Sequence, residues 1–220
     1  MEATLPIVDH SVETRLLAGL SKIALILRHQ GWAEAGEHGL TPTQSQILSL
    51  LWSRRPTALG VSEVAGELAL TKPTVSDSVS ALVRKELLQK ERSTRDARAV
   101  DLRLTSRGED IAAGAAGWPE FLTAAVRALN SQEQAVFLRG LVKMVHSLQH
   151  QGYVPVARMC VNCVSFQPFR DPRDEQPHYC EALNMPMADH ALRLDCPDFT
   201  AASGEQRALI WNTFVGEAFS

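Results

Sequence analysis

Four cysteines in the last third of the chain are the residues best suited to inorganic chemistry. The spacing is C-x2-C, then sixteen residues, Cys, fifteen residues and a final Cys-Pro, and the cysteines are Cys160, Cys163, Cys180 and Cys196. Thiolates at such positions ligate zinc or iron–sulfur clusters, and in an oxidising compartment they would form two disulfides instead. The spacing therefore predicts a four-thiolate centre.

The segment that carries these cysteines, residues 151–200, is poor in large apolar side chains for its length. A segment of this size does not usually offset the entropy of ordering its backbone by so little burial. An inorganic centre that gathers four distant thiolates would act as a staple. We therefore expect a small irregular module held together by its cysteines.

The arrangement of the cysteines favours an iron–sulfur cluster of the four-iron type, with zinc as the alternative. Zinc ribbons generally offer two C-x2-C pairs, whereas this chain has one pair and two isolated cysteines. Cys196-Pro197 is also similar to the Cys-Pro that closes ferredoxin-type ligand sets. His178 and His190 lie near cysteines and could each replace a ligand, although a hydrogen-bonded or surface histidine is the commoner case.

Composition describes an ordinary cytoplasmic protein. The chain has 220 residues, 45% of them hydrophobic, which suits one domain or two. No apolar stretch is long enough to cross a membrane, and Glu2 and Asp9 stand where a secretion signal would be basic. A reducing cytoplasm disfavours the disulfide alternative.

A net charge of −3 is unfavourable for a protein that binds nucleic acid, but the charges are unevenly distributed along the chain. Residues 84–107 carry eight cations against four anions, while much of the acidic excess lies in the cysteine segment. A local basic stretch matters more for DNA binding than the total charge does.

Several helices precede the cysteines. Apolar residues at three- and four-residue spacing predict a helix over residues 11–30, which Gly31 is expected to end. The stretch Thr41-Pro42-Thr43-Gln44 has the residues of a capping box with proline in the first turn, so it predicts the start of a second helix. A short helix at 62–69 and a longer one at 71–87 predict a helix-turn-helix.

A β-hairpin and three further helices are expected after the helix-turn-helix. Residues 88–91 and 99–104 predict two short strands, in which Val100, Leu102 and Leu104 alternate with Asp101 and Arg103. Helices are predicted over 106–128 and 131–149, the second capped by Ser131 with Gln134 three residues on. A last amphipathic helix is expected over 203–219, against the long helices or a partner subunit.

The helix at 71–87 is the candidate for entering the major groove of DNA. Short polar side chains near its N-terminus could reach base edges, and they are Thr74, Ser76, Asp77, Ser78 and Ser80. Lys72 could contact a phosphate. Arg95 and Arg98 at the hairpin tip could enter the adjacent minor groove, with Asp96 holding Arg98 in position.

The chain resembles the MarR family of bacterial transcription regulators over roughly residues 11–150. The resemblance rests on LVRKELL at 82–88 and on DARAVDLRLTSRG at 96–108, where a D-x-R wing is followed by an L-T-x-x-G junction. It implies a double-stranded DNA operator and a homodimer, with a small-molecule effector possible. The chain departs from the family pattern at Glu86, where glycine is usual, and at Asp77, where a basic residue is common.

The predicted fold is mainly α: a winged helix-turn-helix with long dimerisation helices over 1–150, the cysteine segment over 151–200 and a C-terminal amphipathic helix over 201–220. The expected dimer core consists of Leu16, Leu20, Ile23, Leu122, Val136, Leu141 and Val145.

The expected function is that of a DNA-binding regulator, a repressor whose iron–sulfur cluster modulates DNA binding. One alternative is a MarR-type regulator with a structural zinc site that responds to a small aromatic molecule. Another is an iron–sulfur redox protein. An enzyme is not expected, because the sequence has neither a nucleotide-binding glycine-rich loop nor a nucleophile–base constellation.

Overall fold

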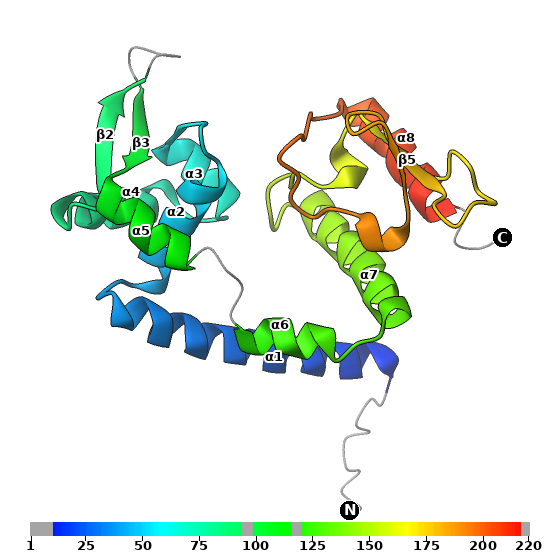
Figure 1. The fold of residues 1–220 in the computed structure, drawn as a ribbon, viewed down its shortest axis with the longest axis horizontal. Coiled ribbons are helices and arrows are strands. Elements are labelled where there is room, and N and C mark those ends of the chain that lie inside the picture. The colour runs from blue at the N-terminus through cyan, green and yellow to red at the C-terminus, as the bar shows by residue number, and fades with distance from the viewer. Residues whose placement is uncertain (1–10, 94–98, 116–119, 217–220) are drawn as a thin grey trace, which may run out of the picture. The chain divides into compact units, whose positions relative to one another are not determined.

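The computed structural model describes residues 11–93, 99–115 and 120–216 and divides the chain into two compact units. The first unit comprises residues 1–58 and 76–116, and the second comprises residues 59–75 and 117–220. The fold is mainly helical, as predicted (Figure 1).

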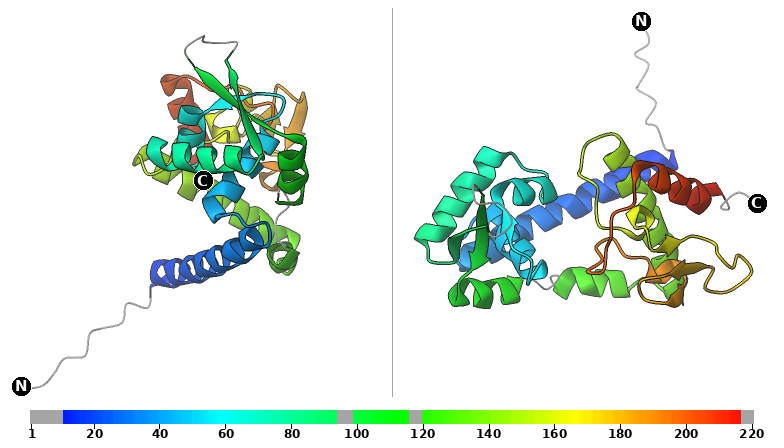
Figure 2. Two further views of the ribbon diagram at one scale, coloured as in Figure 1. Left: turned by 90° about the vertical axis from the view of Figure 1, so that its left-hand side faces the viewer. Right: turned by 90° about the horizontal axis from the view of Figure 1, so that it is seen from above.

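The first unit contains most of the winged helix. Its elements are α1 (Val12–Glu37), α2 (Pro42–Ser53), α4 (Lys72–Arg84) from residue 76 on, β2 (Leu88–Arg92), β3 (Val100–Leu104) and α5 (Ser106–Ala115). Helix α2 packs against α5 and β3, and the buried core includes Ile47, Leu48, Leu82 and Leu102. The hairpin β2–β3 extends from these helices (Figure 2).

Helix α1 is longer than the sequence indicated. It continues through Gly31 to Glu37, so the prediction that Gly31 ends it was wrong (Figure 2). The chain turns instead at Gly39, whose φ of 62° is left-handed, and the Leu40 N–H donates to the carbonyl of Ala35 at 2.8 Å. A glycine inside a helix costs only about 1 kcal/mol, which neighbouring residues can offset.

Helix α2 begins as predicted. The Gln44 N–H donates to Thr41 Oγ1, and the Thr41 N–H donates to Gln44 Oε1, both at 3.3 Å. This reciprocal pair satisfies two backbone donors that a helix N-terminus would otherwise leave without partners.

The junction between α4, β2 and α5 explains the L-T-x-x-G motif. Thr105 Oγ1 donates to the Glu86 carbonyl at 2.7 Å and accepts from the Gly108 N–H at 3.0 Å. A Cβ at Gly108 would lie 2.0 Å from the Leu87 carbonyl oxygen, so only glycine allows α5 to approach the end of α4 this closely.

The predicted hairpin is present, with Leu88 paired to Leu104 and Arg92 to Val100. The predicted alternation of buried and exposed side chains holds at Leu102, which is buried. It fails at the two residues before Leu102. Val100 is exposed and Asp101 is buried, the reverse of the expectation. Strand alternation can shift where the chain leaves the regular ladder, and here the ladder ends at Val100. Arg95, Asp96 and Arg98 lie outside the described residues.

The second unit contains β1 (Leu59–Gly60), α3 (Val61–Glu67), α6 (Glu120–Arg127), α7 (Ser131–His150) and α8 (Gly204–Gly216). Helix α7 is capped by Asn130, whose Oδ1 accepts from the N–H groups of Gln132 and Glu133. The prediction that Ser131 caps this helix was therefore wrong by one residue, since Asn130 supplies the acceptor for these N–H groups. The predicted helix over 106–128 is described as α5 and α6.

The cysteine segment has more structure than expected. Single-turn helices η1 (Cys160–Asn162) and η2 (Asp189–Ala191) flank a small antiparallel sheet in the order β4 (Phe166–Gln167), β5 (His178–Cys180), β6 (Met185–Met187). Its apolar core takes in side chains of α7 and α8, and the buried members include Val142, Met159, Val161, Phe166 and Phe214. The helices supply the apolar surface that the segment lacks.

This shared core changes the predicted division of the chain. The boundaries placed at residues 150 and 200 separate α7 and α8 from the segment they pack against, whereas the structure groups them in one compact unit. The expected packing of the last helix on the long helices is confirmed, since buried Phe214 of α8 joins Val142 of α7 in that core. No helix among the described residues is long and apolar enough to span a membrane.

Candidate DNA-reading helix and cysteine cavity

Helix α4 presents a polar surface opposite its buried side. Val75, Val79 and Leu82 are buried, while Lys72, Thr74, Ser76 and Asp77 are exposed. Ser78 and Ser80 are half-buried, and the Ser80 hydroxyl donates to the Ser76 carbonyl at 2.8 Å. The exposed side chains of Lys72, Thr74, Ser76 and Asp77 could therefore reach a groove of DNA. The Ser80 hydroxyl is already hydrogen-bonded within its own helix.

Arg84 extends this surface and was not singled out from the sequence. It is exposed in the last turn of α4, seven residues after Asp77, so both lie on one side of the helix. The seven-residue spacing between Asp77 and Arg84 could have indicated from the sequence that both lie on one side of the helix. Lys85 has a structural role, because its Nζ donates to the Gly39 carbonyl and to Gln44 Oε1, at 2.9 Å for the latter.

Apolar side chains lie exposed along α1, as expected for a helix that meets another subunit. Leu16 is 61% exposed and Ile23 43%, and Val136 of α7 is 67% exposed. Leu20, Leu122 and Leu141 are half-buried. Val145 is half-buried and packs against the core of the second unit, and its place in the dimer core stays a prediction. Exposed apolar surface of this kind marks an interface.

All four cysteines line one small cavity in the second unit. Cys160, Cys163 and Cys196 are buried and Cys180 is half-buried, and no disulfide joins them. The cavity is completed by Phe166, Ala182 and Asp198. The structure therefore brings together residues that span 37 positions of the chain, from 160 to 196.

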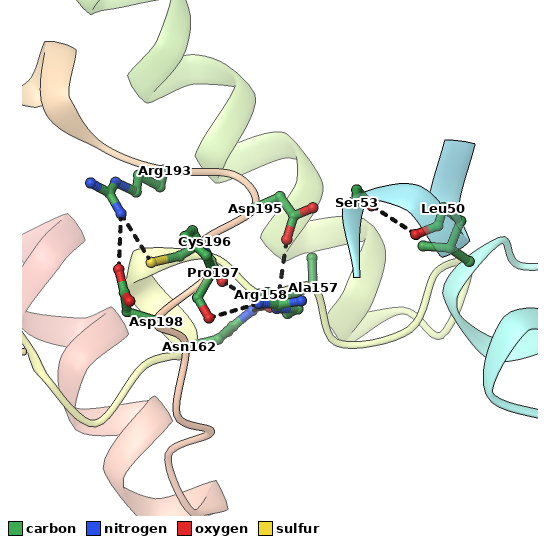
Figure 3. Close-up of polar contacts among 10 residues, drawn as sticks. All are labelled: Leu50, Ser53, Ala157, Arg158, Asn162, Arg193, Asp195, Cys196, Pro197 and Asp198. Atoms are coloured by element: carbon green, nitrogen blue, oxygen red, sulfur yellow. Dashed lines mark hydrogen bonds and ion pairs between the residues drawn. The ribbon is translucent and has the colours of Figure 1, made fainter. Parts of the chain in front are cut away.

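Two arginines hold the loops around this cavity (Figure 3). The backbone N–H of Arg193 donates to Cys160 Sγ at 3.2 Å, and its guanidinium donates to Cys196 Sγ at 3.4 Å and contacts Asp198 at 3.5 Å. The Arg158 guanidinium donates to the carbonyls of Cys196 and Pro197. Donors of this kind stabilise thiolate charge, as they do around thiolate-ligated centres.

Burial dominates the electrostatics of the cavity and raises the pKa of the Cys160 thiol to about 11. The three other cysteines raise this pKa further, whereas the N–H of Arg193 lowers it. Without a cationic centre, Cys160 is therefore a neutral thiol near pH 7. Binding of a metal would have to release protons.

His178 is held by hydrogen bonds on both ring nitrogens. It is 1% exposed, its Nδ1 accepts from the Phe169 N–H at 3.1 Å, and its Nε2 lies 3.0 Å from Asp189 Oδ1. Because Nδ1 accepts, Nε2 carries the proton and donates to Asp189. His178 is therefore a structural residue and not a ligand in this arrangement. His190 is exposed and does not line the cysteine cavity.

Asp189 connects this histidine to the helices. The Arg139 guanidinium of α7 donates to both carboxylate oxygens of Asp189, at 2.9 and 3.1 Å, and to the Phe214 carbonyl of α8 at 3.0 Å. The His178 ring lies two residues from Cys180, so one polar network extends from the cysteine segment to both helices. Sequence spacing gave no signal for it, since Arg139 and Asp189 are 50 residues apart.

The cysteines do not meet at a single point. Among the described residues, no three histidine, cysteine, aspartate or glutamate side chains come close enough together to hold one metal ion. In a tetrahedral zinc site the sulfurs would each lie at about 2.3 Å from the ion. The four cysteines line one cavity without forming such a group.

The model of the MarR family matches residues 38–99, from the start of α2 to the wing. The chain is 24% identical over 133 residues to the uncharacterized HTH-type transcriptional regulator YsmB of Bacillus subtilis, covering 60% of this chain and 90% of YsmB. It is 36% identical over 75 residues to the HTH-type transcriptional regulator MgrA of Staphylococcus aureus, covering 34% of this chain and half of MgrA. The winged-helix region of this chain, residues 38–99, is of the MarR family.

Solved structures show the same fold. MepR of S. aureus in its DNA-binding conformation has a TM-score of 0.55 at 23% identity, covering 61% of this chain and 98% of MepR. FabT of Streptococcus pneumoniae in complex with DNA has a TM-score of 0.53 at 24% identity, covering 63% of this chain and 99% of FabT. The chain is thus similar to DNA-binding transcription regulators of the MarR family.

The MarR region keeps its backbone geometry where its sequence departs from the family pattern. Glu86 occupies the usual glycine position with φ of 58°, so the left-handed turn after α4 is formed by a residue with a side chain. The Leu87 N–H donates to the Leu82 carbonyl at 3.0 Å and closes this turn. The match with the family model ends at residue 99, before the cysteine segment begins.

Proposed function

We propose that this MarR-family protein is a homodimeric repressor whose four cysteines hold an iron–sulfur cluster that modulates its binding to a DNA operator. The observation that carries the proposal is the convergence of four free cysteines, three of them buried, on one cavity. No disulfide joins these cysteines, and several cysteines around one cavity in a reducing compartment favour a metal or cluster as their common partner.

The layout of the cysteines along the chain favours a cluster over zinc. Zinc ribbons generally have two C-x2-C pairs, whereas this chain has one such pair and two isolated cysteines. When bound, such a cluster supplies a redox-active centre that oxygen, nitric oxide or iron shortage can damage. The Cys160 and Cys196 sulfurs would retain the N–H contacts from Arg193.

DNA binding is assigned to α4 and the wing. The exposed Lys72, Thr74, Ser76 and Asp77 are the proposed contacts on α4, with Ser78 and Ser80 at its side. Arg95 and Arg98 remain proposed contacts of the wing. A homodimer would cover the apolar surface of α1 and present two copies of α4 to an operator of matching symmetry.

The path from the cysteines to DNA would run through α7. Arg139 of α7 is bound to Asp189 of the cysteine segment, and α7 also carries exposed Val136, Phe137, Met144 and Leu148 for contact with a second subunit. Loss of the centre would release Cys180 and the neighbouring network, and so alter how the two subunits meet. Such coupling requires the centre to favour one of two arrangements of the dimer.

The cofactor is tested by purifying the protein without oxygen and measuring its visible absorption and its iron, sulfide and zinc content. We expect a brown protein with about four iron and four sulfide per chain. Colourless protein with about one zinc per chain would replace the cluster by a structural zinc site and favour the alternative regulator that responds to a small aromatic molecule.

Modulation of DNA binding is tested with Cys163→Ser and with Val164→Ser as the matched control. Duplexes are first selected from a random-sequence library with the anaerobic protein, and affinity is then measured by fluorescence anisotropy. Cys163→Ser should lose the colour and change operator affinity by roughly tenfold. Val164→Ser, at an exposed neighbouring position, should change neither. A colourless Cys163→Ser protein with unchanged affinity would make the centre merely structural.

Failure of the protein to bind DNA would favour the alternative of an iron–sulfur redox protein. Specific binding to the selected duplex should weaken steeply with salt, because cations displace counterions from phosphates. If the anaerobic protein showed no salt-dependent binding to any selected duplex, the alternative of an iron–sulfur redox protein would regain support.

A further inference from the structure

Helix α4 carries a single acidic residue on the side that faces away from the core. Asp77 is the one aspartate or glutamate among residues 72–84, and its side chain is exposed. It lies two residues from Val75 and two from Val79, which are both buried. Because an α-helix has 3.6 residues per turn, Asp77 lies on the opposite side from these valines. It therefore occupies the middle of the surface that α4 offers to DNA.

The Asp77 carboxylate has no stabilising role within the chain. The side chains three and four positions away carry no positive charge, and they are Pro73, Thr74, Ser80 and Ala81. Asp77 therefore gains nothing from an ion pair at helical spacing. It also lies beyond the first turn of α4, where a negative charge would stabilise the helix dipole. Among the residues that the structure describes, its carboxylate makes no hydrogen bond or ion pair.

The neighbouring hydroxyl groups on this side of α4 already have partners. The Ser80 hydroxyl donates to a backbone carbonyl of α4 at 2.8 Å, and the Thr74 hydroxyl lies 2.8 Å from the Thr71 hydroxyl. Arg84 is exposed two turns after Asp77 and has no carboxylate partner among the described residues. This surface thus offers DNA one anionic acceptor, and one cation further along the helix.

The position of this carboxylate is unfavourable for a contact with the DNA backbone. Duplex DNA carries one negative charge per about 1.7 Å of its axis, so an acid beside a phosphate weakens binding. The floor of the major groove is different, because base edges there present hydrogen-bond donors as well as acceptors. An acid at the middle of a helix in this groove is therefore favourable only opposite a donor.

The major-groove edges of the four bases differ in how well they suit a carboxylate. Guanine presents two acceptors, N7 and O6, and thymine presents the O4 acceptor and a methyl group. Adenine presents the N6 amino group beside the N7 acceptor, which repels a second carboxylate oxygen. Cytosine presents the N4 amino group, a donor, and so matches a side chain that only accepts hydrogen bonds.

We propose that Asp77 is a specificity-determining residue that selects a cytosine in each half-site of the operator. Its carboxylate accepts a hydrogen bond from the N4 amino group of that cytosine. Arg84 lies about 10 Å further along the same side of the helix and supplies positive charge for a phosphate. The inference rests on the proposed contact of α4 with DNA, and it adds the identity of a base pair that α4 reads.

The test selects duplexes from a random-sequence library with the full chain purified without oxygen, and then sequences the bound duplexes. The natural chain should enrich a motif with cytosine at one fixed position of each half-site. Asp77→Asn should enrich adenine at that position and leave the rest of the motif unchanged, because an amide binds both N6 and N7 of adenine. Asp77→Glu keeps a carboxylate and should keep the cytosine.

Fluorescence anisotropy then measures the preference on duplexes that differ only at this base pair. The natural chain should bind the duplex with cytosine roughly tenfold more tightly than the duplex with adenine, and Asp77→Asn should reverse this order. The control Glu175→Gln removes an exposed carboxylate from the cysteine segment and should enrich the natural motif. Because both positions are exposed, each variant should keep the denaturation midpoint of the natural chain in urea.

Two results would overturn the proposal and leave DNA binding by α4 in place. In the first, Asp77→Asn enriches the same motif as the natural chain. In the second, the position that changes in the Asp77→Asn motif is not a cytosine in the natural motif. Enrichment of no motif by the natural chain would overturn this proposal together with the proposed binding to a DNA operator.

Discussion

The two units of this protein are stabilised in different ways. In the first unit the buried residues are mostly aliphatic, and its turns are closed by local backbone bonds such as that from Leu87 to Leu82. In the second unit an apolar core is joined by a buried polar network in which His178, Asp189 and Arg139 connect loops far apart in the chain. The stability of the first unit depends on the close approach of backbone segments. The second unit depends on polar side chains and cysteines that lie far apart in the sequence and come together in the fold.

The largest effect is expected where backbone fit leaves no space, at Gly108 in the first unit. Gly108→Ala would place a methyl group 2.0 Å from the Leu87 carbonyl oxygen, so α5 must move away from the end of α4. We expect a loss of about 4 kcal/mol or more in the free energy of unfolding, measured by urea denaturation. Loss of Thr105's contact with Glu86 would add to this cost.

The control for this variant lies in the same helix. A Cβ at Gly114 would meet nothing within 4 Å, so Gly114→Ala should stabilise α5 by up to about 1 kcal/mol. Equal denaturation midpoints for the two variants would contradict the close approach of α5 to Leu87.

The next effect tests the polar network of the second unit. Arg139→Met keeps most of the apolar stem but removes the two hydrogen bonds to Asp189 and the one to the Phe214 carbonyl. Because the Arg139 side chain is only 17% exposed, we expect a loss of about 2–4 kcal/mol, measured by thermal denaturation. Arg170→Met removes an exposed pair with Asp171 and a contact with the Tyr179 ring, and it should lower the melting temperature much less than Arg139→Met does.

Acid should weaken the same network. Burial acts to raise the pKa of Asp189, but the hydrogen bonds from His178 and Arg139 outweigh it and lower this pKa below the usual aspartate value of 3.8. The stabilisation is therefore complete above that value and is lost as the pH falls through the lower pKa of the folded state. Arg139→Met should show a smaller loss of stability in acid than the natural chain, and an identical acid profile would argue against the pair.

The contrast between local contacts in the first unit and long-range contacts in the second also explains which features could be predicted from the sequence. The capping box at Thr41 depends only on neighbouring residues, and it was visible in the sequence. The end of α1 was mistaken because Gly31 is a weak local signal that the rest of the helix overrides.

The second unit was harder to predict because its contacts are long-range. Strands of two or three residues show no alternation, so the sheet β4–β5–β6 was not expected. The burial of His178 depends on Asp189 and on a backbone N–H nine residues away. The cysteines were the part of this site that the sequence did indicate, because the chemistry of cysteine restricts its possible roles. The structure places all four around one cavity.

A smaller effect should separate α4, the proposed DNA-contacting helix, from α7. Lys72 is exposed at the start of α4, so Lys72→Ala should lower affinity for selected and unrelated duplexes alike, by roughly threefold to tenfold. The slope of log affinity against log salt should fall by about one, which fluorescence anisotropy at several salt concentrations measures. Lys143→Ala on α7 of the second unit should leave both unchanged. A fall in affinity for the selected duplex alone would mean that Lys72 reads a base instead of a phosphate.

The smallest effect concerns the backbone fit of the first unit at Glu86. A residue with a side chain in the left-handed region costs about 1–2 kcal/mol, while glycine loses about 0.5–1 kcal/mol more conformational entropy on folding. Glu86→Gly should therefore stabilise the protein by about 0.5 kcal/mol, seen as a higher denaturation midpoint in urea. Glu86→Ala keeps a Cβ and so should give no gain. If both variants stabilised equally, the effect would come from removing the carboxylate, and the turn after α4 would not be strained.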